Sequence, residues 1–173
     1  MTRFGNVGER SNSVTTVDLQ HLAPLTRRQR VRGAKLADNT PEEWANLRRW
    51  WFGSVYEIAD IEYQRRTWLT PPTRSPHWSY VEFCCSYPDA DQLQFARDHG
   101  HLSAKEFELL AALHHALIPH KAPRGNDYDN RAVLEDPAWH AVIAKAERIR
   151  QQFLTLIVDP IERSYLMGQT DTL

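Results

Sequence analysis

The residues best suited to chemistry are concentrated in one short stretch, from Ser75 to Tyr87, where an acid and two thiols stand among aromatic side chains. Burial among apolar groups raises the pKa of a carboxyl, which makes Glu82 a candidate general acid or base. The favoured interpretation is that Glu82 makes a structural hydrogen bond or ion pair, for example with an arginine of the helix that contains Trp44. Cys84 or Cys85 could act as a nucleophile beside a histidine. Buried thiols are usually inert, however, so we expect two reduced structural cysteines.

Histidines form a second group with chemical potential. Five of the eight fall within 22 residues, at His99, His101, His114, His115 and His120. Zinc needs three or four converging ligands, whereas neighbouring residues such as His114 and His115 point about 100° apart on a helix. The sequence also lacks His-Glu-x-x-His and the paired Glu-x-x-His of di-iron bundles. We therefore expect His114 at the edge of the core, the other four in loops, and no metal or cofactor.

The stretch that holds Glu82 and the cysteines is predicted to be a helix. Ser75 is a suitable N-cap and Pro76 suits the first helical position. A strand is the alternative, but strict alternation of apolar and polar residues is missing. A helix that is apolar on most faces is usually buried among others, so this segment is the expected centre of the fold.

A second predicted helix precedes it. Thr40, Pro41 and Glu43 form a capping box with proline at the first position. The following apolar residues recur at helical spacing and keep their phase through Gly53, which predicts one long helix to about Trp68, kinked at Gly53. The apolar positions of this stripe are Trp44, Leu47, Trp51, Val55, Ile58 and Ile61.

Two further helices follow the cysteines. Asp89 caps a predicted helix that ends before Gly100. Ser103 and Glu106 form another capping box, and Pro119 ends the helix that they begin. Together these signals place two short helices directly after the aromatic stretch.

The last third of the chain contains the most regular helix. Residues 119–135 read as a long polar loop, after which Asp136-Pro137 opens about five turns of apolar stripe. Asp159-Pro160 ends this helix and starts a final one to Met167. The predicted fold class is all-α, an irregular bundle of about six helices around a central apolar helix. Its buried core should include Trp78, Phe83, Trp139 and Phe153.

Length and composition fit a single domain. The chain has 173 residues, 42% of them hydrophobic and 25% charged. Residues 1–17 are polar and predict a mobile tail, and residues 18–173 predict one helical domain. No apolar run approaches the roughly 18 residues that span a bilayer, and a signal pattern is absent, so we expect a cytoplasmic protein without membrane contact.

Charge is unevenly distributed along the chain. Residues 1–74 hold 12 basic and 8 acidic residues, whereas residues 75–173 hold 9 and 14. A basic cluster from Arg27 to Lys35 raises the alternative of a regulator that binds nucleic acid. No DNA-binding motif follows it and aromatic interleaving is absent, so a solvated segment is the favoured interpretation and nucleic acid is not an expected partner.

Two stretches carry a family resemblance. They run from Ser75 to Asp89 (SPHWSYVEFCCSYPD) and from Gly125 to Trp139 (GNDYDNRAVLEDPAW). Together they resemble small helical immunity proteins encoded beside bacterial polymorphic or contact-dependent toxins. The resemblance implies a protein that binds and neutralises a cognate toxin domain without catalysis, and it transfers no active-site residues. A small helical enzyme using Glu82 and the histidines is the alternative.

An acidic loop is the candidate contact surface for such a partner. Asp136 is expected to cap the long helix, whereas Asp127 and Asp129 have no local role visible in the sequence. Tyr128 between them is of a type enriched at binding hot spots. The competing interpretation is a local turn in which Asn126 and Asp127 bond their own backbone. The predicted partner-binding residues are Asp127, Tyr128, Asp129 and Glu135, extended by Asp89 and Asp91.

Overall fold

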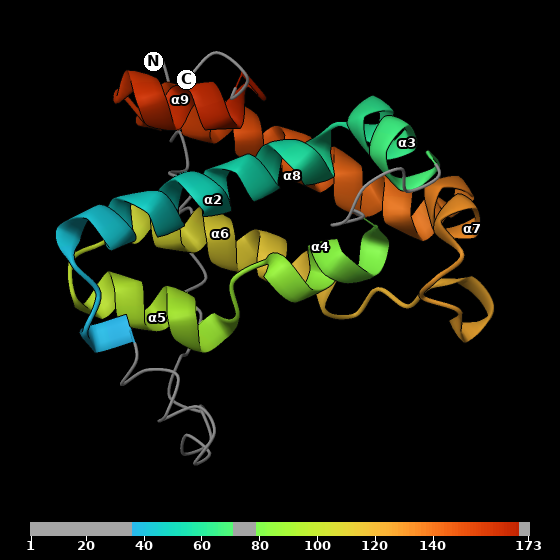
Figure 1. The fold of residues 1–173 in the computed structure, drawn as a ribbon, viewed down its shortest axis with the longest axis horizontal. Coiled ribbons are helices and arrows are strands. Elements are labelled where there is room, and N and C mark those ends of the chain that lie inside the picture. Colours follow the sequence, from blue (N-terminus) through green and yellow to red (C-terminus); the bar gives the residue numbers. More distant parts are fainter. Residues whose placement is uncertain (1–35, 71–78, 170–173) are drawn as a thin grey trace, which may run out of the picture.

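The fold is all-α, as the sequence predicts. A computed structural model describes residues 36–70 and 79–169, and these contain helices and no strands (Figure 1). The predicted tail 1–17, the basic cluster Arg27–Lys35 and the predicted helix start at Ser75, with Trp78, lie outside the described residues. No helix in the described part of the chain combines the length and the apolar character needed to cross a bilayer.

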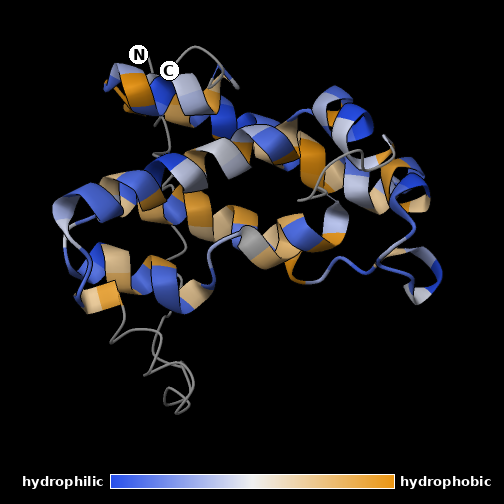
Figure 2. Cartoon of the chain, viewed as in Figure 1, coloured by the Kyte–Doolittle hydropathy of each residue, from blue (hydrophilic) through white to orange (hydrophobic). Residues whose placement is uncertain are grey.

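Two long helices, α2 (Pro41–Ala59) and α8 (Pro137–Leu156), form the centre of the bundle and pack along each other. Helix α9 (Pro160–Leu166) packs on α2, and α6 (Ala104–Leu117) packs on α8. Figure 2 shows hydrophobic residues along much of α6, which lies among the other helices. The expected core residues Phe83, Trp139 and Phe153 are buried, which confirms that part of the prediction.

Most helix starts are those that the sequence predicts. Both halves of the capping boxes at Thr40 and Ser103 are formed. Asp89 caps α5 (Ala90–Asp98), and Asp136 and Asp159 accept backbone hydrogen bonds at the starts of α8 and α9. These signals are local, because the capping side chain and the free N–H groups lie within three residues of each other.

The prediction of one helix from Pro41 to Trp68 is wrong. The chain breaks at Asp60, which separates α2 from α3 (Ile61–Trp68). The Asp60 carboxylate accepts hydrogen bonds from the backbone N–H groups of Glu62 and Tyr63, each at 2.9 Å, and so starts a new helix. The expected kink at Gly53 is not the break, because α2 continues through it.

A buried glutamine fixes α3 against the two central helices. The Gln64 side chain is fully buried, and its Nε2 donates to the carbonyls of Glu57 and Ile58, each at 2.8 Å. Its Oε1 accepts a hydrogen bond from Trp139 Nε1 at 2.9 Å. Gln64 therefore satisfies two carbonyls at the end of α2 and the indole N–H of α8.

The aromatic stretch is a short helix at one edge and not the centre of the fold. Helix α4 (Tyr80–Ser86) begins after Ser79, whose backbone is extended, so a single helix that runs unbroken through Ser79 is excluded. Tyr80, Phe83 and Tyr87 are buried, whereas Glu82 and both cysteines are exposed. The buried residues lie on one side of α4. The sequence did not show this, because apolar residues occupy most faces of the helix.

The predicted loop 119–135 contains regular structure. A turn of 3-10 helix (Pro123–Gly125) is followed by α7 (Asn130–Glu135), which is capped by Asp129. Val133 and Leu134 of α7 are buried against the core. The polar composition of the segment concealed this helix, because its apolar face is only two residues wide.

An ionic cluster joins α2, α6 and α9. The Arg48 guanidinium contacts Glu106 and Glu162, each at 2.7 Å, and donates to the carbonyl of His101 at 2.6 Å. Burial alone would raise the pKa of Glu106, but hydrogen bonds from Arg48 and from the Ser103 N–H outweigh it and lower that pKa. The lowered pKa means that the folded state favours the ionised carboxylate.

Replacing Trp139 by alanine should destabilise the fold by about 3–5 kcal/mol, because it removes a fully buried indole and leaves Gln64 Oε1 without its donor. The matched control is Trp50→Ala on α2, where the indole is 53% exposed and the change should stay below about 1 kcal/mol. Urea unfolding of both variants measures the difference. Similar values for the two tryptophans would contradict this description of the core.

The Glu106→Gln variant should unfold about 1.5–3 kcal/mol more easily at pH 7, because it removes a charged partner of Arg48. A carboxyl with a lowered folded-state pKa stabilises above its unfolded pKa, near 4.5, and loses that contribution as the pH falls through the folded value. The variant should therefore show a flatter loss of stability below about pH 5. Glu108→Gln, an exposed acid on the same helix, is the control. If the free energy of unfolding of Glu106→Gln fell below about pH 5 as steeply as that of the wild type, the role given to Glu106 would be contradicted.

Candidate functional site

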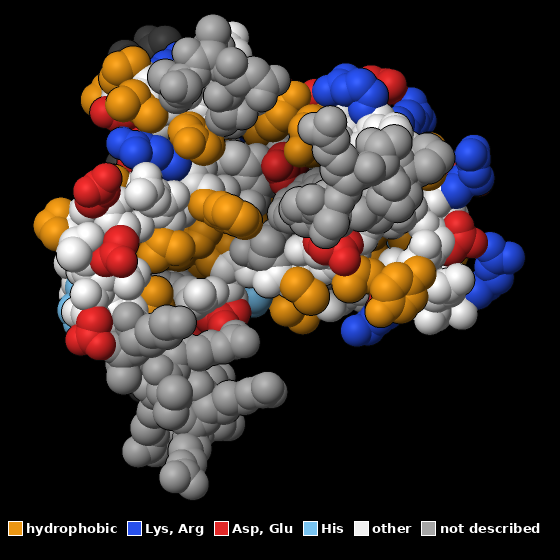
Figure 3. All heavy atoms as spheres, viewed as in Figure 1, with side chains coloured by type: hydrophobic (Ala, Val, Ile, Leu, Met, Phe, Trp, Pro, Cys, Tyr) orange, Lys and Arg blue, Asp and Glu red, His pale blue; other side chains and the backbone are white. Residues whose placement is uncertain are grey.

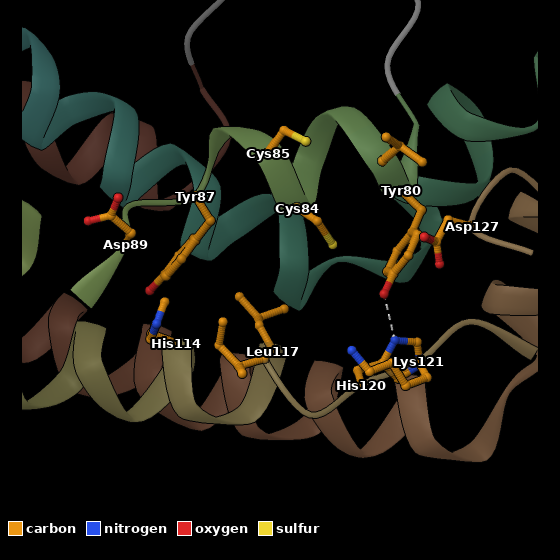
Figure 4. A pocket seen from close by; sticks show the side chains of 12 residues that line it. Tyr80, Cys84, Cys85, Tyr87, Asp89, His114, Leu117, His120, Lys121 and Asp127 are labelled. Carbon is orange, nitrogen blue, oxygen red and sulfur yellow. Dashed lines mark hydrogen bonds between the residues drawn. The ribbon is translucent and has the colours of Figure 1, made fainter. Parts of the chain in front are cut away.

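A pocket of about 380 Å³ lies between α4, the C-terminal end of α6 and the segment that follows it (Figure 4). Its tyrosines come from α4 and the residue that ends it, and the facing wall comes from α6 and the segment that follows α6. The lining consists of Tyr80, Val81, Cys84, Cys85, Tyr87, Asp89, His114, Leu117, Ile118, His120, Lys121 and Asp127. The pocket therefore unites the two stretches of sequence that carry the resemblance to immunity proteins.

Asn130 holds α4 in place at the pocket. Its Oδ1 accepts a hydrogen bond from the Tyr80 backbone N–H, and its Nδ2 donates to the carbonyl of Trp68, both at 3.2 Å. One amide thus satisfies a free N–H at the start of α4 and a carbonyl at the end of α3. This arrangement ties α7 to both helices and orients the Tyr80 side chain.

A buried histidine forms the polar floor of the pocket. His120 Nδ1 lies 2.8 Å from the Tyr80 hydroxyl, and its Nε2 lies 3.2 Å from Asp136 Oδ2 (Figure 4 draws the first bond). The His120 side chain is only 2% exposed, and its ring packs 5.0 Å from that of Trp139. A neutral imidazole satisfies both contacts when Nε2 donates to the carboxylate and Nδ1 accepts from the hydroxyl. His120 therefore lies in a loop, as the sequence predicts, but its side chain is buried against the core.

Cys84 continues this chain of polar groups into the pocket. Its thiol is hydrogen bonded to Tyr80, and in Figure 4 it points towards the pocket, whereas Cys85 points away. Burial of the thiol, with smaller contributions from Cys85 and Asp127, raises the pKa of Cys84 to about 11, although the hydrogen bond to Tyr80 opposes this. Cys84 is thus a protonated and poorly nucleophilic thiol at neutral pH. The expectation of two buried cysteines is wrong, because both residues are exposed to solvent in part.

Glu82 does not belong to the pocket. Its side chain is exposed in the first turn of α4, where its carboxylate accepts a hydrogen bond from the Ser79 hydroxyl. The burial that would make it a general acid or base is therefore absent, which leaves the favoured structural interpretation. The expected structural hydrogen bond exists, but Ser79 donates it and not an arginine of the Trp44 helix.

His99 and His101 pack as aromatic rings. His101 stacks on Trp44 with ring centroids 4.0 Å apart, and His99 stacks on Phe95 at 3.8 Å. Burial, followed by the neighbouring His115, lowers the pKa of His114 at the pocket edge. Within residues 36–70 and 79–169, no three His, Cys, Asp or Glu side chains converge in a way that could hold a metal ion.

The predicted acidic residues have different roles in the structure. Asp127 is exposed and lines the pocket, and the neighbouring Tyr128 is 81% exposed. Asp129 accepts from the Ala132 N–H at 3.0 Å as the cap of α7 and pairs with Arg124 at 3.1 Å. The expectation that Asp129 has no local role is therefore wrong.

Of the other predicted contact residues, one lines the pocket and two do not. Asp89 caps α5 and also lines the pocket, at the end opposite to Asp127 (Figure 4). Asp91 is half-buried in the first turn of α5, and Glu135 is exposed at the end of α7, and neither lines the pocket. The turn alternative holds for Asn126, whose Oδ1 accepts from the Tyr128 N–H at 3.2 Å.

Sequence reasoning did not identify Tyr80, His120 and Asp136 as a connected group. The available signal was a histidine placed directly after the helix-ending Pro119, ahead of the capping Asp136. Neither a protein-family model nor a curated protein nor a solved structure matches this chain. The function is therefore inferred from the pocket and its surroundings.

Alkylation of Cys84 should test the electrostatics of the pocket. In a Cys85→Ser background, the rate with iodoacetamide should rise about tenfold per pH unit from pH 7 to about pH 10, because only the thiolate reacts. Asp127→Asn should speed the reaction, since the negative charge of Asp127 contributes to the raised pKa of the thiol. The same protein unfolded in urea is the control, with a plateau near the ordinary pKa of cysteine. A plateau below about pH 9 in the folded protein would contradict the raised pKa.

Proposed function

We propose that this chain is an immunity protein that binds and neutralises a cognate bacterial toxin domain without catalysis. Both stretches that resemble immunity proteins line one pocket, with α4 and Asp89 from the first and Asp127, which lies beside Tyr80 in Figure 4, from the second. If both stretches contact the toxin, they must lie close together in the folded protein, and the pocket brings them together. We propose the rim of the pocket as the contact surface.

The observation that carries this proposal is the exposure of two large apolar side chains, one that lines the pocket and one next in sequence to a lining residue. Ile118 lines the pocket and is 62% exposed, and Tyr128 follows the lining residue Asp127. Figure 3 shows hydrophobic side chains in several separate places among charged ones, which is ordinary for a protein surface. An exposed tyrosine next in sequence to a residue that lines a pocket is a more specific feature, because tyrosine is enriched at hot spots of protein interfaces.

Charge supports a basic partner. Residues 75–173 carry five more acidic than basic residues, and they provide the pocket and its rim. Toxin domains that cut nucleic acid are often basic, and opposite net charges accelerate association at low salt. A nuclease domain is therefore the kind of toxin that we expect as partner.

The second candidate is a small enzyme, which the linked groups Asp136, His120, Tyr80 and Cys84 favour. An acid that orients a histidine beside a hydroxyl is an arrangement used in acid–base catalysis. Glu82 is exposed, so it lacks the burial that a general acid or base would need. The raised pKa of Cys84 leaves its thiol, the last of the linked groups, protonated. Binding is therefore the better supported function.

The test is calorimetry with the toxin domain encoded beside this protein, the expected neighbour being a large secreted protein with a variable C-terminal domain. Asp127→Lys combined with Tyr128→Ala should raise the Kd at least about tenfold and slow association most at low salt. Asp129 is left unchanged because it caps α7. Glu108→Lys, outside the pocket on α6, is the charge-matched control. Equal affinities of the double variant and the wild type, with both folded, would move the interface elsewhere.

A further inference from the structure

We propose that the pocket receives one basic side chain, a lysine or an arginine, from the partner protein. The inference rests on the proposed function in taking the occupant to be part of a protein. The preference of the pocket for a positively charged group rests on the pocket alone and is testable without the partner.

The dimensions and walls of the pocket suit a single long side chain. Its volume of about 380 Å³ lies at the lower end of the range of about 300–1,000 Å³ that is typical of small-ligand sites. Leu117 supplies apolar surface near the middle, Tyr80 supplies it at the Asp127 end, and Tyr87 supplies it at the Asp89 end (Figure 4). Lysine and arginine bury an aliphatic stem against such surface and keep a charged end group beside polar atoms.

The end of the pocket near Tyr80 is electrostatically negative. Asp127 makes no hydrogen bond or ion pair with any other residue that the structure describes, so its carboxylate is available to a ligand. The carboxylates of Asp127 and Asp136 both act on the Tyr80 hydroxyl, and Asp127 also acts on the Cys84 thiol. After burial, these negative neighbours are among the causes that raise the pKa of both groups, as a negative potential would.

Lys121 is the charged residue of the lining that would oppose a cation. Its side chain is exposed, and a lysine carries its charge on a flexible four-carbon stem that can turn into solvent. The aspartate side chain is short, so the Asp127 carboxylate stays close to its position on the backbone. Asp89 adds a second carboxylate at the other end of the pocket, although one of its oxygens caps α5.

Disulfide exchange at Cys84 tests the preference for charge directly. The Cys85→Ser protein is equilibrated with three small thiols of similar length and their disulfides, namely cysteamine, 2-mercaptoethanol and 3-mercaptopropionate. Intact mass spectrometry gives the fraction of each cap on Cys84. We expect the cationic cysteamine cap to exceed the neutral one by about twofold to fivefold, the effect of one partly exposed charge pair, and the anionic cap to be least favoured.

Matched variants assign the effect to the pocket. Asp127→Asn should remove the preference for cysteamine, and Lys121→Met should increase it. The Cys84→Ser protein, which keeps Cys85 as its only cysteine, should show no preference between the caps. Equal amounts of the three caps, a preference for the anionic cap, or an undiminished preference in Asp127→Asn would each overturn the inference.

The same chemistry tests the occupant. Capping Cys84 with 2-mercaptoethanol should weaken binding of the neighbouring toxin domain at least about tenfold, because the cap occupies the place of the incoming side chain. Capping Cys85 in the Cys84→Ser protein is the control. Tight binding despite the Cys84 cap would overturn the inference and leave the proposed function intact. Absence of binding by the uncapped protein would overturn both the proposed function and a toxin side chain as occupant, whatever cap the pocket prefers.

Discussion

The hydrogen bond between Gln64 and Trp139 is the interaction on which the rest of the architecture depends. An amide with no exposed surface is tolerated only when its polar atoms are paired, and Gln64 pairs with the end of α2 on one side and with α8 on the other. The sharp turn at Asp60 brings α3 back to the end of α2 and so allows this pairing. The break at Asp60 and the burial of Gln64 therefore depend on each other.

Trp139 transmits that constraint to the pocket. Its indole packs against Trp68 at 5.9 Å, Tyr80 at 5.3 Å and His120 at 5.0 Å, and aromatic pairs at such distances favour defined relative orientations. Tyr80 and His120 are then joined by a hydrogen bond, and Asp136, the cap of α8, holds the other nitrogen of His120. The floor of the pocket is thus positioned by the core itself, which gives its polar groups fixed positions that a surface loop would not provide.

The parts of the fold that the sequence predicts are those decided within a few residues. Helix starts at Thr40, Asp89 and Ser103 follow from a side chain and the N–H groups beside it. The break at Asp60 has a local cap as well, but an uninterrupted apolar stripe concealed it, and only the contact with Trp139 makes it necessary. Exposure of Glu82 and Cys84 is likewise a tertiary property, because it depends on which side of α4 faces α3 and α8. The candidate site was half predictable for this reason: Asp127 and Tyr128 lie where an acidic loop suggested, whereas His120 owes its role to the folded core.

Capping explains why acidic residues close in sequence differ in what they can recognise. Asp60, Asp89, Asp129, Asp136 and Asp159 each precede a helix and accept backbone hydrogen bonds. A carboxylate used in this way is already stabilised by the N–H groups and the dipole of its helix, so a partner gains less from pairing with it. Asp127 stands only two residues before the cap Asp129 and has no helix to start. All of these acids contribute to the long-range field that steers a basic protein, but close recognition depends on the few that the fold leaves unused. In this chain, the position of a carboxylate relative to the next helix distinguishes a structural acid from one that is free to bind.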